Sequence, residues 1–80
     1  MRFFNWDRDP AVLLDSGVTL VFDPLSLEVA EGDTAGMLRD EAAPELSREA
    51  FMSRFGSAWP FLEEAIRSRQ SGDAKSSAAP

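Results

Sequence analysis

The side chains that enzymes most often use for acid–base and nucleophilic chemistry are missing from this sequence. It has no histidine, no cysteine and no tyrosine, so the common catalytic dyads and triads cannot be assembled. Its one lysine, Lys75, lies in a polar C-terminal stretch and stays hydrated there. Asp7 and Asp9 are close enough for paired-carboxylate chemistry, but a chain of 80 residues has little material to enclose a sugar. We therefore expect a protein that is not an enzyme.

Oxygen atoms are the metal ligands that this composition offers. Carboxylates form two local clusters, one at Asp7 and Asp9 and the other at Glu28, Glu31 and Asp33. Neither cluster has the ligand spacing and central glycine of a calcium-binding loop. The chain also lacks the glycine-rich phosphate-binding motifs of nucleotide-binding proteins. We interpret both clusters as solvated acidic surface, and we expect neither a metal nor a cofactor.

Acidic residues outnumber basic ones and are concentrated in the first part of the chain. Fourteen aspartates and glutamates against eight lysines and arginines give a formal net charge of −6. Residues 1–46 hold ten acidic and three basic residues, a net charge of −7, whereas residues 47–80 hold four and five, a net charge of +1. Phosphate backbones repel such a chain, so direct nucleic-acid binding is not expected. The acidic part either keeps the protein soluble or docks onto a basic partner protein.

Aromatic side chains gather in two segments, residues 3–6 and residues 55–61. A domain this small cannot bury all of them centrally, so some lie under a loosely packed loop or form an exposed patch. Exposed aromatic rings with a polar rim are typical of protein interfaces, and Trp6 and Trp59 are the anchors that this interpretation favours. The predicted partner-binding residues combine these two rings with the acidic clusters: Trp6, Asp7, Asp9, Glu28, Glu31, Asp33 and Trp59.

A β-hairpin is the clearest local signal in the chain. Apolar side chains at every second position predict a strand over residues 18–23, and Ala11–Leu14 is a second short β-prone run. The three residues between them, 15–17, end in Gly17, where a hairpin loop of this length usually needs a positive φ. These features together predict two antiparallel strands joined by a tight loop.

The N-terminal segment is predicted to add a strand over Arg2–Trp6. Because Phe3 and Phe4 are adjacent, a strand here would point them to opposite faces of the sheet. Pro10 cannot donate a ladder hydrogen bond, so Asp7–Pro10 is predicted to be a connection or an edge.

The stretch LSLEVAE supports two interpretations. Its alternation places Leu25, Leu27 and Val29 on one face, which favours a further strand. Asp23 as N-cap and Pro24 at the first helical position would instead begin a short helix. The strand is the interpretation we prefer, and the helix remains the alternative.

Beyond residue 32 the pattern becomes helical. Asp33 is expected to cap a helix over Thr34–Glu41, in which Ala35 and Leu38 share the apolar face and Met37 flanks it.

Two further helices are expected near the C-terminus. Ser47 is predicted to cap one that ends at Gly56 in a left-handed conformation. The last helix is expected to begin near Ser57 or Trp59, with Pro60 tolerated in its first turn. Its apolar face is predicted to hold Trp59, Leu62, Ala65 and Ile66.

Strands that precede helices indicate an α+β fold. We expect a β-hairpin or three-stranded antiparallel sheet in the N-terminal half, packed against two or three short C-terminal helices. Residues 1–70 are predicted to form this single domain and residues 71–80 a disordered tail, since the tail is polar, small and unpatterned.

The functional interpretation follows mainly from exclusion. The chain has no apolar run near the ~18 residues of a membrane span, and its start does not resemble a signal peptide, so a cytoplasmic protein is expected. Composition suggests a bacterial or phage origin. We expect a small acidic interaction module of inhibitor, antitoxin, immunity or adaptor type that docks onto a basic partner protein. The alternative is a structural protein that forms homodimers.

Overall fold

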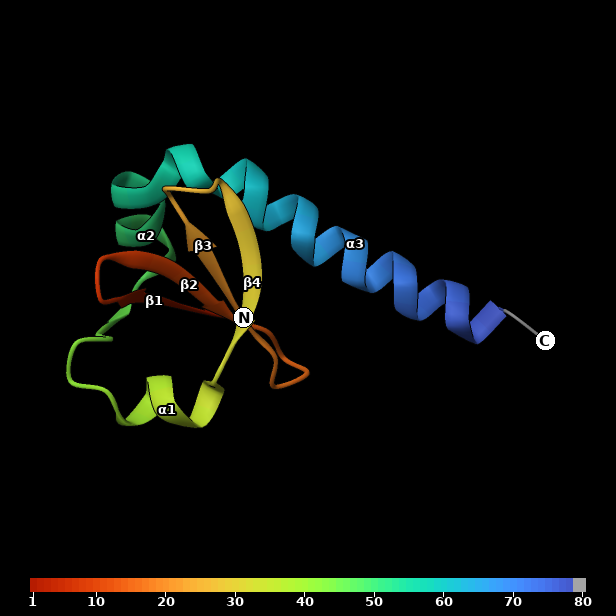
Figure 1. Cartoon of the computed structure of the whole chain (residues 1–80), viewed down its shortest axis with the longest axis horizontal. Coiled ribbons are helices and arrows are strands. Elements are labelled where there is room, and N and C mark those ends of the chain that lie inside the picture. The colour runs from red at the N-terminus through yellow and green to blue at the C-terminus, as the bar shows by residue number, and fades with distance from the viewer. Residues whose placement is uncertain (79–80) are drawn as a thin grey trace.

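Five antiparallel strands form a single sheet in the order β4-β3-β2-β1-β5 (Figure 1). The structure, a computed structural model, describes the backbone of residues 1–78 and the side chains of residues 1–69. The strands are β1 (Arg2–Trp6), β2 (Asp9–Leu13), β3 (Thr19–Asp23), β4 (Glu28–Gly32) and β5 (Glu45–Leu46). Consecutive strands pair from β1 to β4, and β5 returns to pair with the other side of β1.

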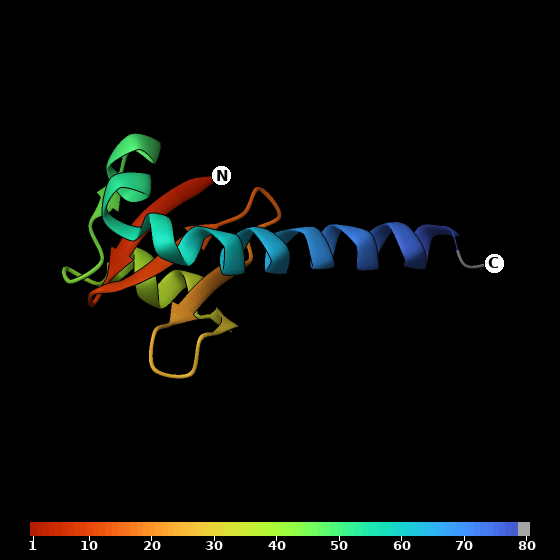
Figure 2. The same cartoon turned by 90° about the horizontal axis from the view of Figure 1, so that it is seen from above.

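Helices cover both faces of this sheet. They are α1 (Thr34–Arg39), α2 (Arg48–Phe55) and α3 (Trp59–Ala78), and a 3₁₀ turn at Gly56–Ala58 joins α2 to α3. Helices α2 and α3 lie against one face, and α1 lies on the other (Figure 1). Seen from above, α3 continues beyond the sheet (Figure 2).

The predicted α+β class is confirmed, but its details need correction. The sheet has five strands rather than two or three, and the C-terminal part is dominated by one long helix of 20 residues rather than by two or three short ones. The division into a domain over residues 1–70 and a disordered tail over residues 71–80 stays a prediction. Residues 79–80 of that tail lie outside the described residues.

Two tight turns connect the first three strands. The expected hairpin between β2 and β3 is confirmed, with Gly17 at φ 95° in its loop. The turn between β1 and β2 contains only Asp7 and Arg8, at φ 49° and 74°. Two positive φ values define a type I′ turn, which usually contains glycine at its second position. Arg8 therefore occupies a conformation that is unfavourable for a residue with a Cβ atom.

Pro10 lies inside β2, which has a neighbouring strand on each side, so the prediction of a connection or an edge is wrong at this residue. The Asn5 N–H donates to the Pro44 carbonyl at 3.0 Å, on the side of β1 that faces away from β2. The Asn5–Pro10 pair is therefore not hydrogen-bonded, and the Pro10 nitrogen faces β3. The register of β2 with β3 begins only at Ala11, so the missing N–H breaks no ladder bond.

The alternation after Pro24 gave a strand prediction that begins too early. Pro24–Leu27 form the four-residue loop of the hairpin between β3 and β4, and the helical alternative is wrong as well. Asp23 holds this loop, because its Oδ1 accepts the Leu25 N–H at 2.9 Å and its carbonyl accepts the Leu27 N–H at 2.8 Å. Both leucines consequently lie outside the sheet and are exposed.

Helix α1 forms where it was predicted, but it buries a different face. Met37 is fully buried, whereas Leu38 is 49% exposed. Met37 packs against Phe4, Ala11 and Leu13 on the sheet, so the direction in which the chain leaves β4 decides the orientation of this six-residue helix.

The predicted start of α2 is confirmed, and its predicted end is wrong. Ser47 caps the helix, since its Oγ accepts the Ala50 N–H at 3.1 Å. Gly56 has φ −57° and ψ −33°, which is right-handed helical backbone rather than the expected left-handed stop. The chain therefore continues through the 3₁₀ turn into α3.

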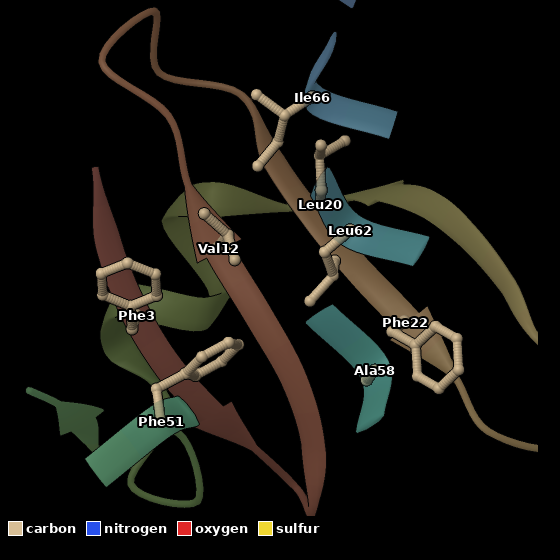
Figure 3. Close-up of a cluster of buried hydrophobic side chains, with 8 residues drawn as sticks. All are labelled: Phe3, Val12, Leu20, Phe22, Phe51, Ala58, Leu62 and Ile66. Carbon is tan, nitrogen blue, oxygen red and sulfur yellow. The ribbon is translucent and has the colours of Figure 1, made fainter. Parts of the chain in front are cut away.

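Neighbouring phenylalanines on β1 belong to two separate cores, as their adjacency predicted. Phe3 lies under α2 and α3, with its ring centroid 4.9 Å from that of Phe51. Phe4 lies on the opposite face, under α1 and the segment that follows it. The larger core contains Phe3, Val12, Leu20, Phe22, Phe51, Ala58, Leu62 and Ile66 (Figure 3).

Trp6 covers the smaller core at the end of β1. Its Nε1 donates to Asp40 Oδ2 at 3.0 Å, which fixes the ring. A Cβ atom built on Gly32 would approach Trp6 Cζ3 and Val21 Cγ2 to 2.9 Å each. The ring therefore lies so close to the backbone of β4 that only glycine fits at position 32.

We expect Gly32→Ala to destabilise the protein by about 1–3 kcal/mol, because the added methyl group displaces Trp6 or Val21. Urea unfolding followed by tryptophan fluorescence measures this change. Gly56→Ala is the matched control: its Cβ meets nothing within 4 Å, and its backbone is helical. That substitution should stabilise the protein by about 0.5–1 kcal/mol. Equal stability of Gly32→Ala and the unsubstituted protein would contradict the close packing of Trp6 on β4.

Arg8→Gly is expected to raise the free energy of unfolding by about 0.5–1 kcal/mol, because glycine relieves the left-handed conformation. Arg8→Ala serves as the control, since it removes the same charge and keeps the Cβ atom. The midpoint of urea unfolding should rise for the glycine variant alone. Equal midpoints for the two variants would show that the turn holds no such strain.

Candidate functional site

Three of the predicted acidic residues meet at one end of the sheet. The turn that contains Asp7 and the start of β2 at Asp9 lie at the same end as the hairpin from Asp23 to Glu28. Partial burial raises the pKa of Asp9, and the carboxylates of Asp23 and Asp7 raise it further by repelling its charge. This end of the sheet therefore concentrates negative charge, and it includes Asp23, which was not among the predicted partner-binding residues.

The other two predicted acidic residues lie elsewhere. Glu31 is near the far end of β4, and its Oε1 lies 3.8 Å from Nε of Arg69 on α3. Asp33 occupies the N-cap position of α1, where its carbonyl accepts the Met37 N–H at 2.9 Å and its carboxylate caps no N–H group. The predicted acidic surface is thus divided between the two ends of the sheet.

Both predicted tryptophan anchors are half-buried and have partners within the domain. Trp6 packs on the smaller core and donates to Asp40. The pKa of Asp40 is lowered by the Ala42 N–H and then by this indole donor. Trp59 lies with its ring centroid 6.2 Å from that of Phe3, and the Arg48 guanidinium lies 6.0 Å above its ring. These contacts give both rings a structural role.

The large apolar side chains that are exposed near the acidic end were not predicted. Leu25 is 95% exposed and Leu27 56% exposed in the loop between β3 and β4, and Phe61 is 42% exposed on the first turn of α3. The Phe61 ring centroid lies 5.2 Å from that of Phe22, which positions the ring beside β3. The Asp23-Pro24 dipeptide was the available signal, since it predicts a turn rather than a strand at this point.

A shallow groove continues from these residues along β4 and α3. Its volume is about 460 Å³, and its apolar walls are Leu27 and Val29 on one side and Pro60, Phe61 and Ala65 on the other. We call the loop residues Leu25 and Leu27, together with Phe61, the apolar patch. Glu64 lies in the wall of the groove, and Glu28 follows Leu27 directly in the chain.

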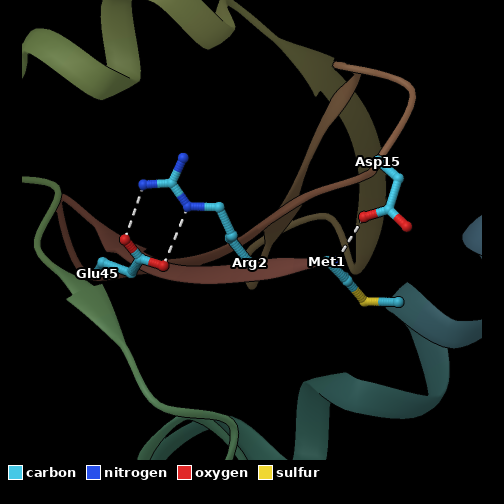
Figure 4. A network of polar contacts seen from close by, with 4 residues as sticks. All are labelled: Met1, Arg2, Asp15 and Glu45. Carbon is cyan, nitrogen blue, oxygen red and sulfur yellow. Dashed lines mark hydrogen bonds and ion pairs between the residues drawn. The ribbon is translucent and has the colours of Figure 1, made fainter.

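A second hollow of about 380 Å³ lies between the N-terminus, the loop after β2 and α3. Its charged groups are paired: the Met1 ammonium lies 2.6 Å from Asp15 Oδ1, and Glu31 faces Arg69 (Figure 4 shows the Met1 contact). The N-terminal ammonium lowers the pKa of Asp15. Both ion pairs connect neighbouring elements, but they are exposed and therefore contribute little to stability.

Arg2 ties the first strand to the last one. Its Nη2 and Nε donate to the two carboxylate oxygens of Glu45 at 2.8 and 3.1 Å (Figure 4). The hydrogen bonds from Arg2 lower the pKa of Glu45 and raise that of Arg2. This contact supports the short strand β5, which has only two residues.

Among the residues with described side chains, no group of three or more carboxylates, histidines or cysteines is arranged to hold a metal ion. Within residues 1–78, no helix has both the length and the apolar character needed to cross a membrane. Comparisons with protein-family models, with curated proteins and with solved structures give no match for this chain.

The raised pKa of Asp9 predicts that the contribution of this one side chain to stability becomes more favourable as the pH falls. The folded state binds a proton more readily than the unfolded state, so ionised Asp9 opposes folding at pH values above its folded pKa. Asp9→Asn should therefore stabilise the protein at neutral pH by less than about 1 kcal/mol. The gain should disappear as the pH falls through the folded pKa to the unfolded value. Urea unfolding across this pH range measures it.

Glu45→Gln is the control variant, for which the opposite change in stability at neutral pH is expected. The folded pKa of Glu45 is lowered, so its stabilising effect is present above the unfolded pKa and is lost as the pH falls through the folded pKa. The variant should be less stable at neutral pH and equal to the unsubstituted protein in strong acid. A stabilising Glu45→Gln or a destabilising Asp9→Asn would contradict these assignments.

Proposed function

We propose that this protein is a small acidic interaction module, without catalytic activity, that docks onto a basic partner protein in the manner of an inhibitor, antitoxin, immunity protein or adaptor. The observation that carries the proposal is the position of the apolar patch. Leu25, Leu27 and Phe61 are exposed beside the end of the sheet where Asp9, Asp23 and Glu28 gather.

Apolar and acidic groups would contribute to binding in different ways. Exposed leucine and phenylalanine side chains gain free energy when a partner removes them from water, so they act as anchors. The carboxylates around them attract a basic surface from a distance and speed up encounter. The net charge of −6 supports the same choice of partner. The absence of cysteine agrees with a cytoplasmic setting, which we include in the proposal.

The test is affinity capture from nuclease-treated lysate of the source organism, with the full chain as bait and mass spectrometry as readout. We expect a basic protein in stoichiometric amount that the Leu25→Ser/Phe61→Ser bait no longer retains. Leu38→Ser is the matched control, since Leu38 is also half-exposed but lies on α1. Circular dichroism of each bait checks the fold. A basic partner retained equally by both variants, or no basic partner at all, would contradict the proposal.

Homodimer formation is the second candidate, and the unpaired outer side of β4 favours it. Within the described backbone, β4 pairs with β3 alone and ends the sheet. Two copies could pair along this edge. Light scattering over a range of concentrations decides the question, because a constant monomer mass excludes it.

A further inference from the structure

The outer edge of β4 offers backbone hydrogen-bonding groups that no strand uses. Hydrogen-bonded and non-hydrogen-bonded pairs alternate along an antiparallel ladder. The Leu14 N–H donates to the Val18 carbonyl at 2.8 Å, so Val18 and every second residue after it on β3 direct their polar groups toward β2. Val21, which lies between such residues, directs its groups toward its partner Ala30 on β4.

The same alternation assigns the outward groups of β4. Ala30 faces β3, so its neighbours Val29 and Glu31 point their N–H and carbonyl groups to the open side. In the part of the chain with described backbone, nothing pairs with this side of the sheet. An extended segment laid beside β4 would find two donors and two acceptors at strand spacing.

The groove lies along this open edge. Leu27 and Val29 from the strand side and Phe61 and Ala65 from α3 form its apolar walls. Helix α3 packs against both β3 and β4, so it lies beside the position that a sixth strand would take. Side chains of such a strand that point to the α3 face would enter the groove, as alternate residues do in strand addition.

Charge determines what kind of segment fits. Glu28 and Glu31 flank the edge, and Glu64 lies in the wall of the groove. Arg69 is the basic residue in this wall, and it already lies 3.8 Å from Glu31. A second copy of the chain would carry the same net charge of −6, so the two copies would repel each other. A strand with basic side chains is the complementary occupant.

We infer that β4 accepts an extended segment of a partner protein as a sixth strand, in which apolar residues alternate with lysine or arginine. The apolar side chains enter the groove, and the basic ones meet Glu28 and the neighbouring carboxylates. This inference rests on the proposed function and specifies the partner and the mode of binding. It depends on the backbone of Val29 and Glu31, which the apolar patch does not include.

The test uses a fluorescently labelled peptide of alternating valine and lysine and measures its anisotropy with the full chain. A peptide with the same residues in two blocks and one of alternating valine and glutamate are the controls. The alternating valine–lysine peptide should bind at least ten-fold more tightly than either. Equal binding of the block peptide would overturn strand addition, since charge and composition alone would then explain the affinity.

Substitutions at Glu31 separate the contribution of its backbone N–H to peptide binding from the contribution of its charge. Glu31→Pro removes an outward N–H together with the carboxylate, and proline is tolerated where the N–H of an edge strand faces solvent. Glu31→Gln removes the charge alone. We expect a two- to five-fold loss of peptide affinity for glutamine and a further loss of ten-fold or more for proline. Equal affinities of the two variants would overturn the inference.

Hydrogen exchange on the unsubstituted protein provides a measurement that does not depend on the folding of a variant. The amides of Val29 and Glu31 should exchange faster than that of Ala30 in the free protein and become protected when the valine–lysine peptide is added. Unchanged exchange at saturating peptide would contradict strand addition. If light scattering shows a dimer that Glu31→Pro dissociates, a second copy occupies the edge and the inference is wrong.

Affinity capture with the Glu31 variants as bait distinguishes a failure of this inference from a failure of the proposed function. Strand addition requires that Glu31→Pro loses the partner that Glu31→Gln retains. If both retain it while Leu25→Ser/Phe61→Ser loses it, the proposed function stands and strand addition fails. If no variant loses a partner, the proposed function fails as well.

Discussion

The two-sided burial of β1 and β2 is the constraint on which the rest of the structure depends. Phe3 and Phe4 point to opposite faces, and Val12 lies opposite Ala11 and Leu13 in the same way. A sheet with large apolar groups on both faces needs a cover on each. Helices α2 and α3 supply one cover, and α1 with the segment up to β5 supplies the other. A short chain thus uses all three of its α-helices to close two cores.

This use of the helices explains which large apolar side chains are left exposed. Trp59 is needed above Phe3 and Phe51, and Trp6 is needed above the smaller core, so neither ring is free. The hairpin loop after β3 and the outward face of α3 do not cover either core. Exposed apolar groups remain there, beside Asp9, whose pKa is raised by partial burial and by repulsion from the carboxylates of Asp23 and Asp7. The candidate surface lies where the two cores impose no requirement.

Short-range signals were sufficient for the strands near the N-terminus and insufficient for the elements whose position depends on the whole fold. Period-2 alternation and Gly17 predicted the hairpin, because both act within a few residues. The same alternation failed at Leu25 and Leu27, where the Asp23 side chain closes a loop instead. Met37 rather than Leu38 is buried because the sheet orients α1. Composition predicted an acidic surface, but the apolar side chains beside it appear only when β3 and α3 come together.

The composition of β4 is consistent with an edge that discriminates between partners. Natural edge strands are protected against uncontrolled pairing by lysine, proline, bulges or an overlying segment. The strand EVAEG has none of the first three, and its register with β3 is regular over all five residues. The net charge of −6 opposes the approach of a second copy and does not oppose a basic strand. An edge of this kind suits the proposed basic strand, whose alternate apolar residues would lie in the adjoining groove.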